Sequence, residues 1–516
     1  MTSFSLLQDF IYNSCLSHSD KTAIFDKERI LTFKELYNMT NGAGRFLQDK
    51  GVKRGDRIAV LLDKSIEQIL ALFGSLKSDA CFVLINPALG KPQIRHILTD
   101  CNVKILITAD KFAQMVNEIK TDISELIVVY EDDFKNGIKA YYGEERICGN
   151  ITDDICSIIY TSGSTGLPKG IVITHRNIID GARIVSQYLN IDSNDRLLGL
   201  LPFNFDYGFN QLATTLYKGA QIELFQYFMP NTLMKTLRER KITGLAAIPS
   251  IWSSVFNPRL AVQNDDYDYP DLRYITNSGG KLPVTIVKQI REKFKKTKLF
   301  LMYGLTEAFR STYLSPEELD KRPDSIGKAI PDVEVEVINS DGMICKPGEE
   351  GELIHRGACI ARGYWNNPAK TAEVYKPNPL LPPENRFLET VVYSGDIVRK
   401  DEQGFLYFIS RKDNMIKTSG YRVSPTEVEE LILQFSGVVE VVVFGLSDPA
   451  IGQKIRAVVT VSSNIETKDI INFCKKTAPL YMVPQEIYIE ETMPRTSTGK
   501  LDRPQIILRS REKYGD

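Results

Sequence analysis

Short apolar runs alternate with amphipathic segments along the first half of the chain, and this alternation limits the possible folds more than any other feature. Four runs have the length and composition of buried strands, namely "RIAVLL" (57–62), "ACFVLI" (80–85), "KILITA" (104–109) and "LIVVY" (126–130). Between the first two, "SIEQILALFGSLK" (65–77) places its apolar residues at helical spacing. Such alternation predicts α/β layers around largely parallel sheets, and a similar pattern returns across 196–305.

Two helix-capping motifs support the predicted α/β pattern. "TFKE" at Thr32–Glu35 matches a capping box before a helical pattern that stops near Gly51. Near the other end, Ser424 and Glu427 form a second capping box, with Pro425 at the first helical position. Each motif predicts where a helix begins.

The pattern changes past residue 330. Strand-like segments punctuated by turns cover 332–338, 348–357 and 404–409, and they predict a smaller β-rich subdomain. A final unit of roughly 100 residues follows, with mixed helix and strand patterns. The predicted fold class is therefore α/β, with a large N-terminal domain (1–411) of layered α/β subdomains plus a β-rich subdomain, and a small α+β C-terminal domain (412–516).

Charge and composition exclude several classes of protein. The 64 Lys+Arg and 65 Asp+Glu residues leave no global field for nucleic acid or anionic membranes, so any phosphate site must be local. The eight cysteines contain no CxxC pair and predict buried reduced thiols, while the four histidines show no i,i+4 ligand pair. No apolar run is long enough for a signal sequence or a membrane span. We therefore expect a soluble, cytoplasmic protein.

The stretch "TSGSTGLPKG" (161–170) has the composition of a phosphate-binding loop. Its Gly, Ser and Thr residues let backbone N–H groups and hydroxyls converge on an anion, and Lys169 adds positive charge. It differs from the kinase and GTPase loop because Pro168 precedes the lysine, Gly170 follows it, and a strand pattern comes next. A plain surface hairpin is the alternative for such a loop.

Three later motifs add chemistry in the same chain. "YGLTE" offers Tyr303 for base stacking, Thr306 for a phosphate and Glu307 for Mg²⁺. "YSGD" offers Asp396, whose two oxygens suit the hydroxyls of a ribose. "PRTSTGKLDR" presents Lys500 on a Gly/Ser/Thr loop. Each motif alone is compatible with an ordinary loop or a solvated side chain.

Taken together and in this order, the motifs resemble those of the AMP-forming adenylating superfamily. That superfamily comprises acyl- and aryl-CoA synthetases, adenylation domains of peptide synthetases, and firefly luciferase. The resemblance covers nearly the whole chain and also includes "SRKDNMIKTSGYRVSPTEVEE" (410–430). It implies a mobile C-terminal domain and two half-reactions: a carboxylate attacks the α-phosphorus of ATP and expels pyrophosphate, then a thiol attacks the acyl-adenylate and releases AMP.

The resemblance also implies roles for individual residues. The β- and γ-phosphates of ATP would be held by Thr161, Ser162, Gly163, Ser164, Thr165, Gly166 and Lys169. The rest of the nucleotide site would comprise Thr306 on a phosphate, Glu307 on Mg²⁺, Tyr303 against adenine, Gly279 and Gly280 leaving room for adenine and the acyl group, and Asp396 with Arg411 on the ribose hydroxyls.

Catalysis is expected to depend on Lys500. Its cation would bridge the attacking carboxylate and an α-phosphate oxygen, two anions that repel each other. Asp413 matches the hinge of the superfamily, about which the C-terminal domain would rotate. That rotation would bring Lys417 and Gly420 to the site for thioester formation, with the glycine letting a pantetheine arm pass close to the backbone.

The acid substrate is left between two classes. Phe205–Asp206 match the "FD" of amino-acid-activating members, in which the aspartate holds the substrate ammonium. A buried carboxylate is costly unless a cation pairs with it, which favours an amino acid, whereas a non-amino acyl acid is the alternative. Because no carrier segment follows in this sequence, we expect the thiol on CoA or on a separate carrier protein.

Rival functions differ in their chemistry. A kinase or ATPase would release ADP rather than AMP, and a luciferase-like oxidase would depend on oxygen. A catalytically inactive nucleotide sensor is disfavoured because Lys500, Glu307 and Asp396 are all present.

Overall fold

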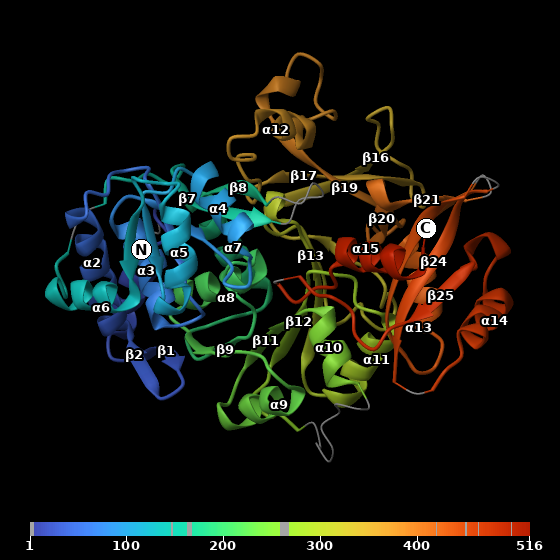
Figure 1. Cartoon of the computed structure of the whole chain (residues 1–516), viewed down its shortest axis with the longest axis horizontal. Helices are drawn as coiled ribbons and strands as arrows, with labels where there is room; N and C mark the ends of the chain where they lie inside the picture. Colours follow the sequence, from blue (N-terminus) through green and yellow to red (C-terminus); the bar gives the residue numbers. More distant parts are fainter. Residues whose placement is uncertain are drawn as a thin grey trace.

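The computed structural model describes residues 5–145, 148–161, 168–257, 268–418, 421–448, 451–462, 464–496 and 498–515 (Figure 1). Of residues 413, 417, 421 and 422 it describes the backbone but not the side chain. The chain forms a large N-terminal part with two α/β sheets and a β-rich subdomain, followed by a smaller C-terminal domain, as the sequence predicted. Among the described helices, none combines the length and the apolar content needed to cross a bilayer.

The first α/β sheet has six strands in the order β6-β5-β3-β4-β7-β8. Its strands are β3 (Arg57–Leu61), β4 (Cys81–Leu84), β5 (Ile105–Thr108), β6 (Ile127–Tyr130), β7 (Ile155–Thr161) and β8 (Lys169–Thr174). Its helices are α2 (Phe33–Asp49), α3 (Ile66–Lys77), α4 (Lys91–Asp100), α5 (Ala113–Lys120) and α6 (Glu131–Ala140), with the 3₁₀ turn η1 (Asp110–Phe112). All strand pairs are parallel except β7–β8, which is an antiparallel hairpin.

Both faces of this sheet are buried, which explains its continuous apolar runs. Ile58 and Val60 enter the core that also holds residues of α2 and α3, whereas Ala59 and Leu61 enter a second core with residues of α4 and α5. Successive side chains of a strand point to opposite faces, so one run serves two cores. The predicted capping box forms at the start of α2, where Thr32 and Glu35 exchange side-chain and backbone hydrogen bonds.

The second sheet has nine strands in the order β15-β14-β13-β12-β11-β9-β10-β1-β2. Its strands are β1 (Thr22–Asp26), β2 (Arg29–Thr32), β9 (Arg196–Gly199), β10 (Gln221–Leu224), β11 (Gly244–Ala247), β12 (Tyr274–Asn277), β13 (Lys298–Tyr303), β14 (Thr312–Leu314) and β15 (Lys328–Ala329). Its helices are α1 (Asp9–His18), α7 (His175–Tyr188), α8 (Asp206–Tyr217), α9 (Pro230–Glu239), α10 (Pro249–Val255) and α11 (Val284–Lys293). The strands from β1 through β13 pair in parallel, and antiparallel pairs close both edges.

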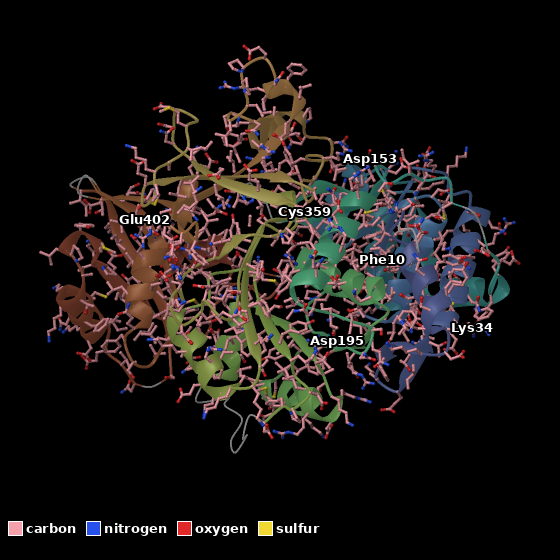
Figure 2. All side chains as sticks on the ribbon, turned by 180° about the vertical axis from the view of Figure 1, so that it is seen from behind. Phe10, Lys34, Asp153, Asp195, Cys359 and Glu402 are labelled. Atoms are coloured by element: carbon pink, nitrogen blue, oxygen red, sulfur yellow. The ribbon has the colours of Figure 1, made fainter. Side chains whose placement is uncertain are left out.

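One core joins segments that are far apart in the sequence. Phe10 of α1 and Cys359 of the β-rich subdomain belong to the same buried cluster (Figure 2). The N-terminal α/β sheets and the β-rich subdomain are therefore packed as one body. The cysteines are free thiols, and six of the eight, Cys81 and Cys156 among them, are buried as predicted, whereas Cys15 and Cys148 are only partly buried.

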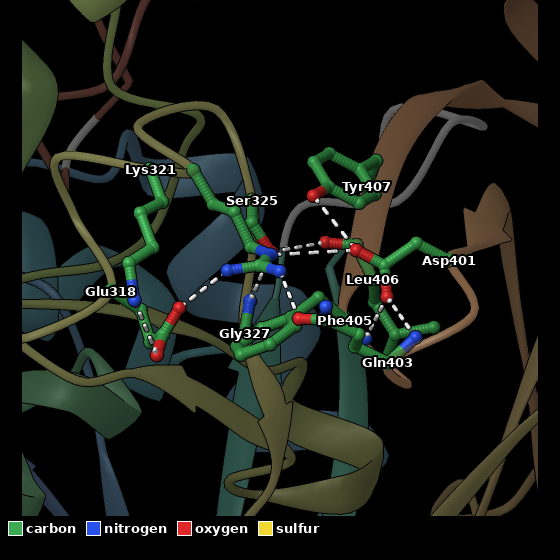
Figure 3. Close-up of polar contacts among 10 residues, drawn as sticks. Glu318, Lys321, Ser325, Gly327, Asp401, Gln403, Phe405, Leu406 and Tyr407 are labelled. Atoms are coloured by element: carbon green, nitrogen blue, oxygen red, sulfur yellow. Dashed lines mark hydrogen bonds and ion pairs between the residues drawn. The ribbon is translucent and has the colours of Figure 1, made fainter.

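The β-rich subdomain is an antiparallel sheet of the order β16-β17-β19-β18, with β20 paired to β19. Its elements are β16 (Val333–Ile338), β17 (Glu350–Gly357), α12 (Pro368–Val374), β18 (Tyr375–Pro377), η3 (Arg386–Leu388), β19 (Thr390–Lys400) and β20 (Leu406–Arg411). The side chain of Arg322 stabilises the turn before β20. It forms ion pairs with Glu318 at 2.5 Å and with Asp401 at 3.5 Å, and it donates a hydrogen bond to Gln403. Figure 3 shows this network, in which Asp401 also accepts from Tyr407. The network fixes the strand that ends at Arg411.

The C-terminal domain lies beside β20, where the hydroxyl of Ser424 donates to the carbonyl of Ile409 (Figure 1). Its elements are η4 (Lys412–Asn414), β21 (Ile416–Thr418), β22 (Tyr421–Val423), α13 (Pro425–Leu433), β23 (Val438–Asp448), β24 (Gly452–Val461), α14 (Thr467–Thr477), η5 (Leu480–Met482), β25 (Glu486–Ile489) and α15 (Arg503–Tyr514). Pro425 opens α13 as predicted, and Ser424 accepts from the N–H of Glu427. The reciprocal half of the predicted capping box is not among the hydrogen bonds of the described residues. Alternate residues of β23 pack against α13 and α14 on one face and against α15 on the other.

Candidate functional site

The predicted phosphate loop connects the two strands of the β7–β8 hairpin. Thr161 and Lys169, its two described members, face each other as register partners at the loop end of the hairpin. The other predicted members, Ser162, Gly163, Ser164, Thr165 and Gly166, lie outside the described residues. The strand–loop–strand setting predicted from the sequence is present.

A segment from the β-rich subdomain braces the hairpin. The N–H of Val172 donates to the carbonyl of Gly363 at 2.9 Å, and the N–H of Trp365 donates to the carbonyl of Gly170 at 2.8 Å. Gly170 itself has no room for a side chain, because an added Cβ would lie 2.8 Å from Ile158. The start of β8, directly after the loop, is therefore packed between Ile158 of β7 and the segment 363–365.

Asp396 lies at the centre of a buried polar group. The hydroxyl of Tyr303 donates to its Oδ2 at 2.5 Å, and Nη1 of Arg411 donates to its Oδ1 at 2.7 Å. Burial raises the pKa of Asp396, and the neighbouring guanidinium and hydroxyl oppose that rise. Each carboxylate oxygen has more than one acceptor position, so further hydroxyl donors can still bind there. These three predicted nucleotide residues are brought together by the structure.

Tyr303 has a second neighbour that sequence reasoning missed. Its ring stacks on His355, with centroids 6.1 Å apart and an interplanar angle of 21°. His355 is completely buried, and within the described part of the chain neither of its ring nitrogens has a hydrogen-bond partner. Burial lowers the pKa of His355 to about 3, so this imidazole is neutral.

Glu307 lies in the short 3₁₀ helix η2 (Thr306–Ala308), which begins at the predicted phosphate contact Thr306. The hydroxyl of Tyr364 donates to Oε1 of Glu307 at 2.5 Å, a contact that the motif "YGLTE" does not predict. A carboxylate has a second oxygen and several acceptor positions, and carboxylate oxygen is the donor type that Mg²⁺ prefers. Glu307 therefore fits the predicted metal-binding role.

Lys500 reaches from the C-terminal domain into the N-terminal part. Its ammonium lies 4.8 Å from the centre of the Phe205 ring. Its Cε is so near Gly279 that a Cβ added there would come within 3.1 Å, and Gly279 has φ +77°, a conformation that favours glycine. Gly279 therefore makes room for this lysine. Burial lowers the pKa of Lys500, Asp206 raises it, and Arg310 lowers it further, so the three charged groups interact.

Asp206 opens α8 and is buried, with an exposed fraction of 4%. Its Oδ2 lies 3.8 Å from Nη1 of Arg310, which is 2% exposed. The sequence reasoning did not include Arg310, although it stands three positions after Glu307. The buried carboxylate predicted at Phe205–Asp206 thus has a cationic partner from the chain itself.

Two cavities open where the domains meet. One of about 310 Å³ is lined by Ile248, Gly279, Lys281 and Lys500 among others. A second of about 380 Å³ also borders Gly280, and its wall includes Arg411 and Asn414. The predicted glycines therefore line the space between the catalytic lysine candidate and the Asp396 group.

The predicted residues for the second half-reaction are only partly described. The backbones of Asp413 and Lys417 lie in η4 and β21, but their side chains are outside the described set, and so is the whole of Gly420. Their roles stay predictions.

Comparison with known proteins gives a consistent result. A family model described as "AMP-binding enzyme" matches residues 12–365, and one described as "AMP-binding enzyme C-terminal domain" matches 427–500. Surfactin synthase subunit 2 of Bacillus subtilis is 30% identical over 94% of this chain, which spans only 13% of that protein's length. A long-chain-fatty-acid–CoA ligase of the same organism is 27% identical, over 98% of this chain and 95% of its own.

The fold is similar to that of solved ligases. The anthranilate CoA ligase AuaEII, in complex with anthranoyl-AMP, superposes with a TM-score of 0.89 at 26% identity, over 99% of this chain and 97% of that one. The similarity extends across both domains.

Proposed function

Since the chain belongs to the AMP-binding enzyme family and is an AMP-forming ligase, we propose that it is an acid–thiol ligase. It activates a carboxylic acid with ATP as an acyl-adenylate and then transfers the acyl group to a phosphopantetheine thiol. The single observation that carries this proposal is the position of Lys500, whose ammonium enters the N-terminal part between Phe205 and Gly279.

In the first step, a carboxylate oxygen of the acid bonds to the α-phosphorus of ATP, and the bond from that phosphorus to the pyrophosphate oxygen breaks. Both reactants are anions, so the cation of Lys500 lowers the cost of bringing them together. Thr161 and Lys169 flank the proposed phosphate loop, and Glu307 would hold Mg²⁺. Bound Mg²⁺ would supply charge neutralisation at the phosphates.

Asp396 serves nucleotide binding in this proposal. Tyr303 and Arg411 hold its carboxylate in one orientation, so that its oxygens can accept hydrogen bonds from the ribose hydroxyls. Because the site is prearranged, little side-chain ordering remains to be done on binding.

In the second step, the sulfur of the thiol bonds to the acyl carbon, AMP leaves, and the thiol proton is released. We propose that the C-terminal domain (412–516) rotates about Asp413 for this step, which withdraws Lys500 and presents Lys417 and Gly420. CoA and a carrier protein are both suitable thiols. The similarity to a CoA ligase supports the first, and the similarity to a peptide synthase supports the second.

Two classes of acid follow from different observations. Phe205–Asp206 and the peptide-synthase relatives support an amino acid, whose ammonium would face Asp206. The ion pair between Asp206 and Arg310 supports an acyl acid, because the buried carboxylate is already paired.

The experiment is a panel of carboxylic acids assayed for pyrophosphate release and for hydroxamate formation in the presence of hydroxylamine. The wild-type protein should release pyrophosphate with at least one acid, with AMP and not ADP as the nucleotide product. Lys500→Ala should slow this step about 10²- to 10³-fold, as the loss of one electrostatic stabiliser does, while ATP still binds. A Lys500→Ala variant that forms acyl-adenylate at the wild-type rate would refute the proposal.

A further inference from the structure

Arg310 is a buried guanidinium with unused donors. Its side chain is 3% exposed, and its Nη1 faces Asp206 at 3.8 Å. Within the described part of the chain, Nε and Nη2 have no hydrogen-bond partner. Buried donors are nearly always paired with protein groups, water or a ligand, so these N–H groups point to a missing acceptor.

The backbone before Arg310 adopts a rare conformation. Phe309 has φ +44° and ψ −47°, values that a residue with a side chain seldom adopts. Its ring is completely buried against Gly181, where an added Cβ would come within 2.5 Å of it. Packing therefore holds the strained turn, and such strain concentrates at ligand sites. The turn separates Glu307, which faces Tyr364, from Arg310, which faces Asp206.

Further polar atoms near Arg310 also lack partners among the described residues. The guanidinium lies 4.8 Å from the ring of Tyr207, the residue after Asp206. Asn210 lies one turn further along α8, and Ser311 follows Arg310 directly. The buried Nδ2 of Asn210 and the buried Oγ of Ser311 find no hydrogen-bond partner in the described ranges of the chain. Polar groups without a partner in the described part of the chain therefore lie beside the aromatic rings of Tyr207 and Phe309 that surround this guanidinium.

The charges of Asp206, Arg310 and Lys500 determine which substituent of an acid can bind beside them. In the proposed mechanism the cation of Lys500 faces the reacting carboxylate, which leaves Asp206 and Arg310 as an oppositely charged pair. A substrate ammonium at Asp206 would lie beside the guanidinium and be repelled by it. An oxygen acceptor would instead find the free N–H groups of Arg310, whose planar fork suits carboxylates and other oxygens.

We propose that Arg310 is a specificity-determining residue that selects acids carrying a second oxygen-bearing group, such as a hydroxyl, a carbonyl or a second carboxylate. Amino acids and unsubstituted acyl acids are disfavoured, the first by repulsion and the second because the donors stay unpaired. This inference rests on the proposed function, since it names the class of acid that the ligase activates.

The test compares acids that differ in one substituent. Butyrate, 3-hydroxybutyrate, succinate, 2-aminobutyrate and 3-aminobutyrate form one series, and the same substituents on octanoate and benzoate form two more. The readout is kcat/KM for pyrophosphate release by the full chain. On the best scaffold the wild type should favour the hydroxyl or carboxyl acid at least tenfold over the plain and amino acids. The hydroxyl and carboxyl arms distinguish a neutral acceptor from an anionic one.

The variant Arg310→Met should remove this preference, so that kcat/KM for the oxygenated acid falls at least tenfold, to the level of the plain acid in the same variant. Arg310→Lys should keep part of it, because it retains the charge but loses the fork. Asp206→Asn combined with Arg310→Met removes both charges, so it tests selectivity even if a lone Asp206 prevents folding. Arg322→Met is the matched control, since Arg322 is also ion-paired but belongs to the network of Figure 3, and its ranking of acids should equal the wild type's.

Each outcome is decisive. A wild type that prefers a plain or amino acid, or a preference for oxygenated acids that survives Arg310→Met in a folded protein, overturns the role of Arg310. Melting temperatures establish folding. Absence of pyrophosphate release with every acid refutes the proposed function itself and this inference with it.

Discussion

Lys281 of the N-terminal part and Glu430 of the C-terminal domain form an ion pair, with Nζ and Oε1 2.5 Å apart. Lys281 directly follows Gly279 and Gly280, and Glu430 lies on α13. The pair therefore joins the two domains next to the cavity that Lys500 enters. In the proposed mechanism it stabilises the arrangement used for adenylation and must break before thioester formation.

Charge reversal tests this ion pair. Lys281→Glu places two carboxylates opposite each other, so it should slow adenylation about 2- to 5-fold, which corresponds to about 0.5–1 kcal/mol for a partly exposed pair. The double variant Lys281→Glu with Glu430→Lys should recover most of the rate. Acyl transfer from preformed acyl-adenylate should not slow in the single variant. Equal rates in the single and double variants would show that the pair has no part in domain closure.

The pH dependence of adenylation should report the state of Lys500. Burial lowers the pKa of its ammonium, so the charge is lost at a lower pH than for an exposed lysine. The single-turnover adenylation rate should therefore fall as the pH rises toward that lowered pKa. Lys500→Arg should be slower but should lack this alkaline decline, because a guanidinium stays protonated. An identical decline in both proteins would assign the titration to another group.

Asp396 should determine the affinity for the nucleotide. Asp396→Asn keeps the shape of the side chain but removes the charge that Arg411 and Tyr303 hold in place, so Kd for ATP should rise about tenfold, or about 1.4 kcal/mol. Tyr303→Phe removes one hydrogen bond and should have a smaller effect. Isothermal titration calorimetry measures both. Unchanged ATP affinity in Asp396→Asn would remove this carboxylate from the nucleotide site.

His355 should make the fold sensitive to acid. Its pKa is lowered to about 3 in the folded protein, below the ordinary value of 6.5, because burial disfavours the charged ring. Above pH 6.5 the ring is neutral in both the folded and the unfolded chain, and the free energy of unfolding has its full value. As the pH falls from 6.5 toward 3, only the unfolded chain takes up this proton, so the free energy of unfolding decreases, by about 2 kcal/mol at pH 5.

His355→Phe preserves the stack on Tyr303 and removes the titrating ring. The decrease in melting temperature between pH 7 and pH 5 should therefore be smaller in this variant. His175, whose pKa burial lowers to about 4, and His18, whose pKa burial also lowers, remain and contribute to the residual decrease. A variant with the wild-type decrease would show that His355 does not resist protonation in the fold.

The sequence predicted what depends on local patterns. The strands from 57 to 130, the capping box at Thr32, and the order of the nucleotide motifs need only neighbouring residues, and the structure contains them. The pairing of Asp206 with Arg310 and of Glu307 with Tyr364 joins side chains from distant segments. Sequence periodicity does not predict contacts between distant segments. The sequence therefore did not indicate that the charge of Asp206 is balanced by Arg310, and the structure shows this pairing. An amino-acid substrate was favoured because its ammonium would pair with the buried Asp206. Arg310 already supplies a cation to this carboxylate, so the pairing no longer requires a substrate ammonium.

The bracing of the β7–β8 hairpin by Gly363 and Trp365 has a consequence for biosynthesis. A nascent chain that has emerged only as far as residue 300 carries the whole glycine-rich loop but lacks the segment that clamps its exit strand. Translation must add about 190 residues beyond Val172 before that clamp can close. The β7–β8 hairpin should therefore reach its packed state late on the ribosome, and a truncated product should leave its strand β8 accessible to proteases.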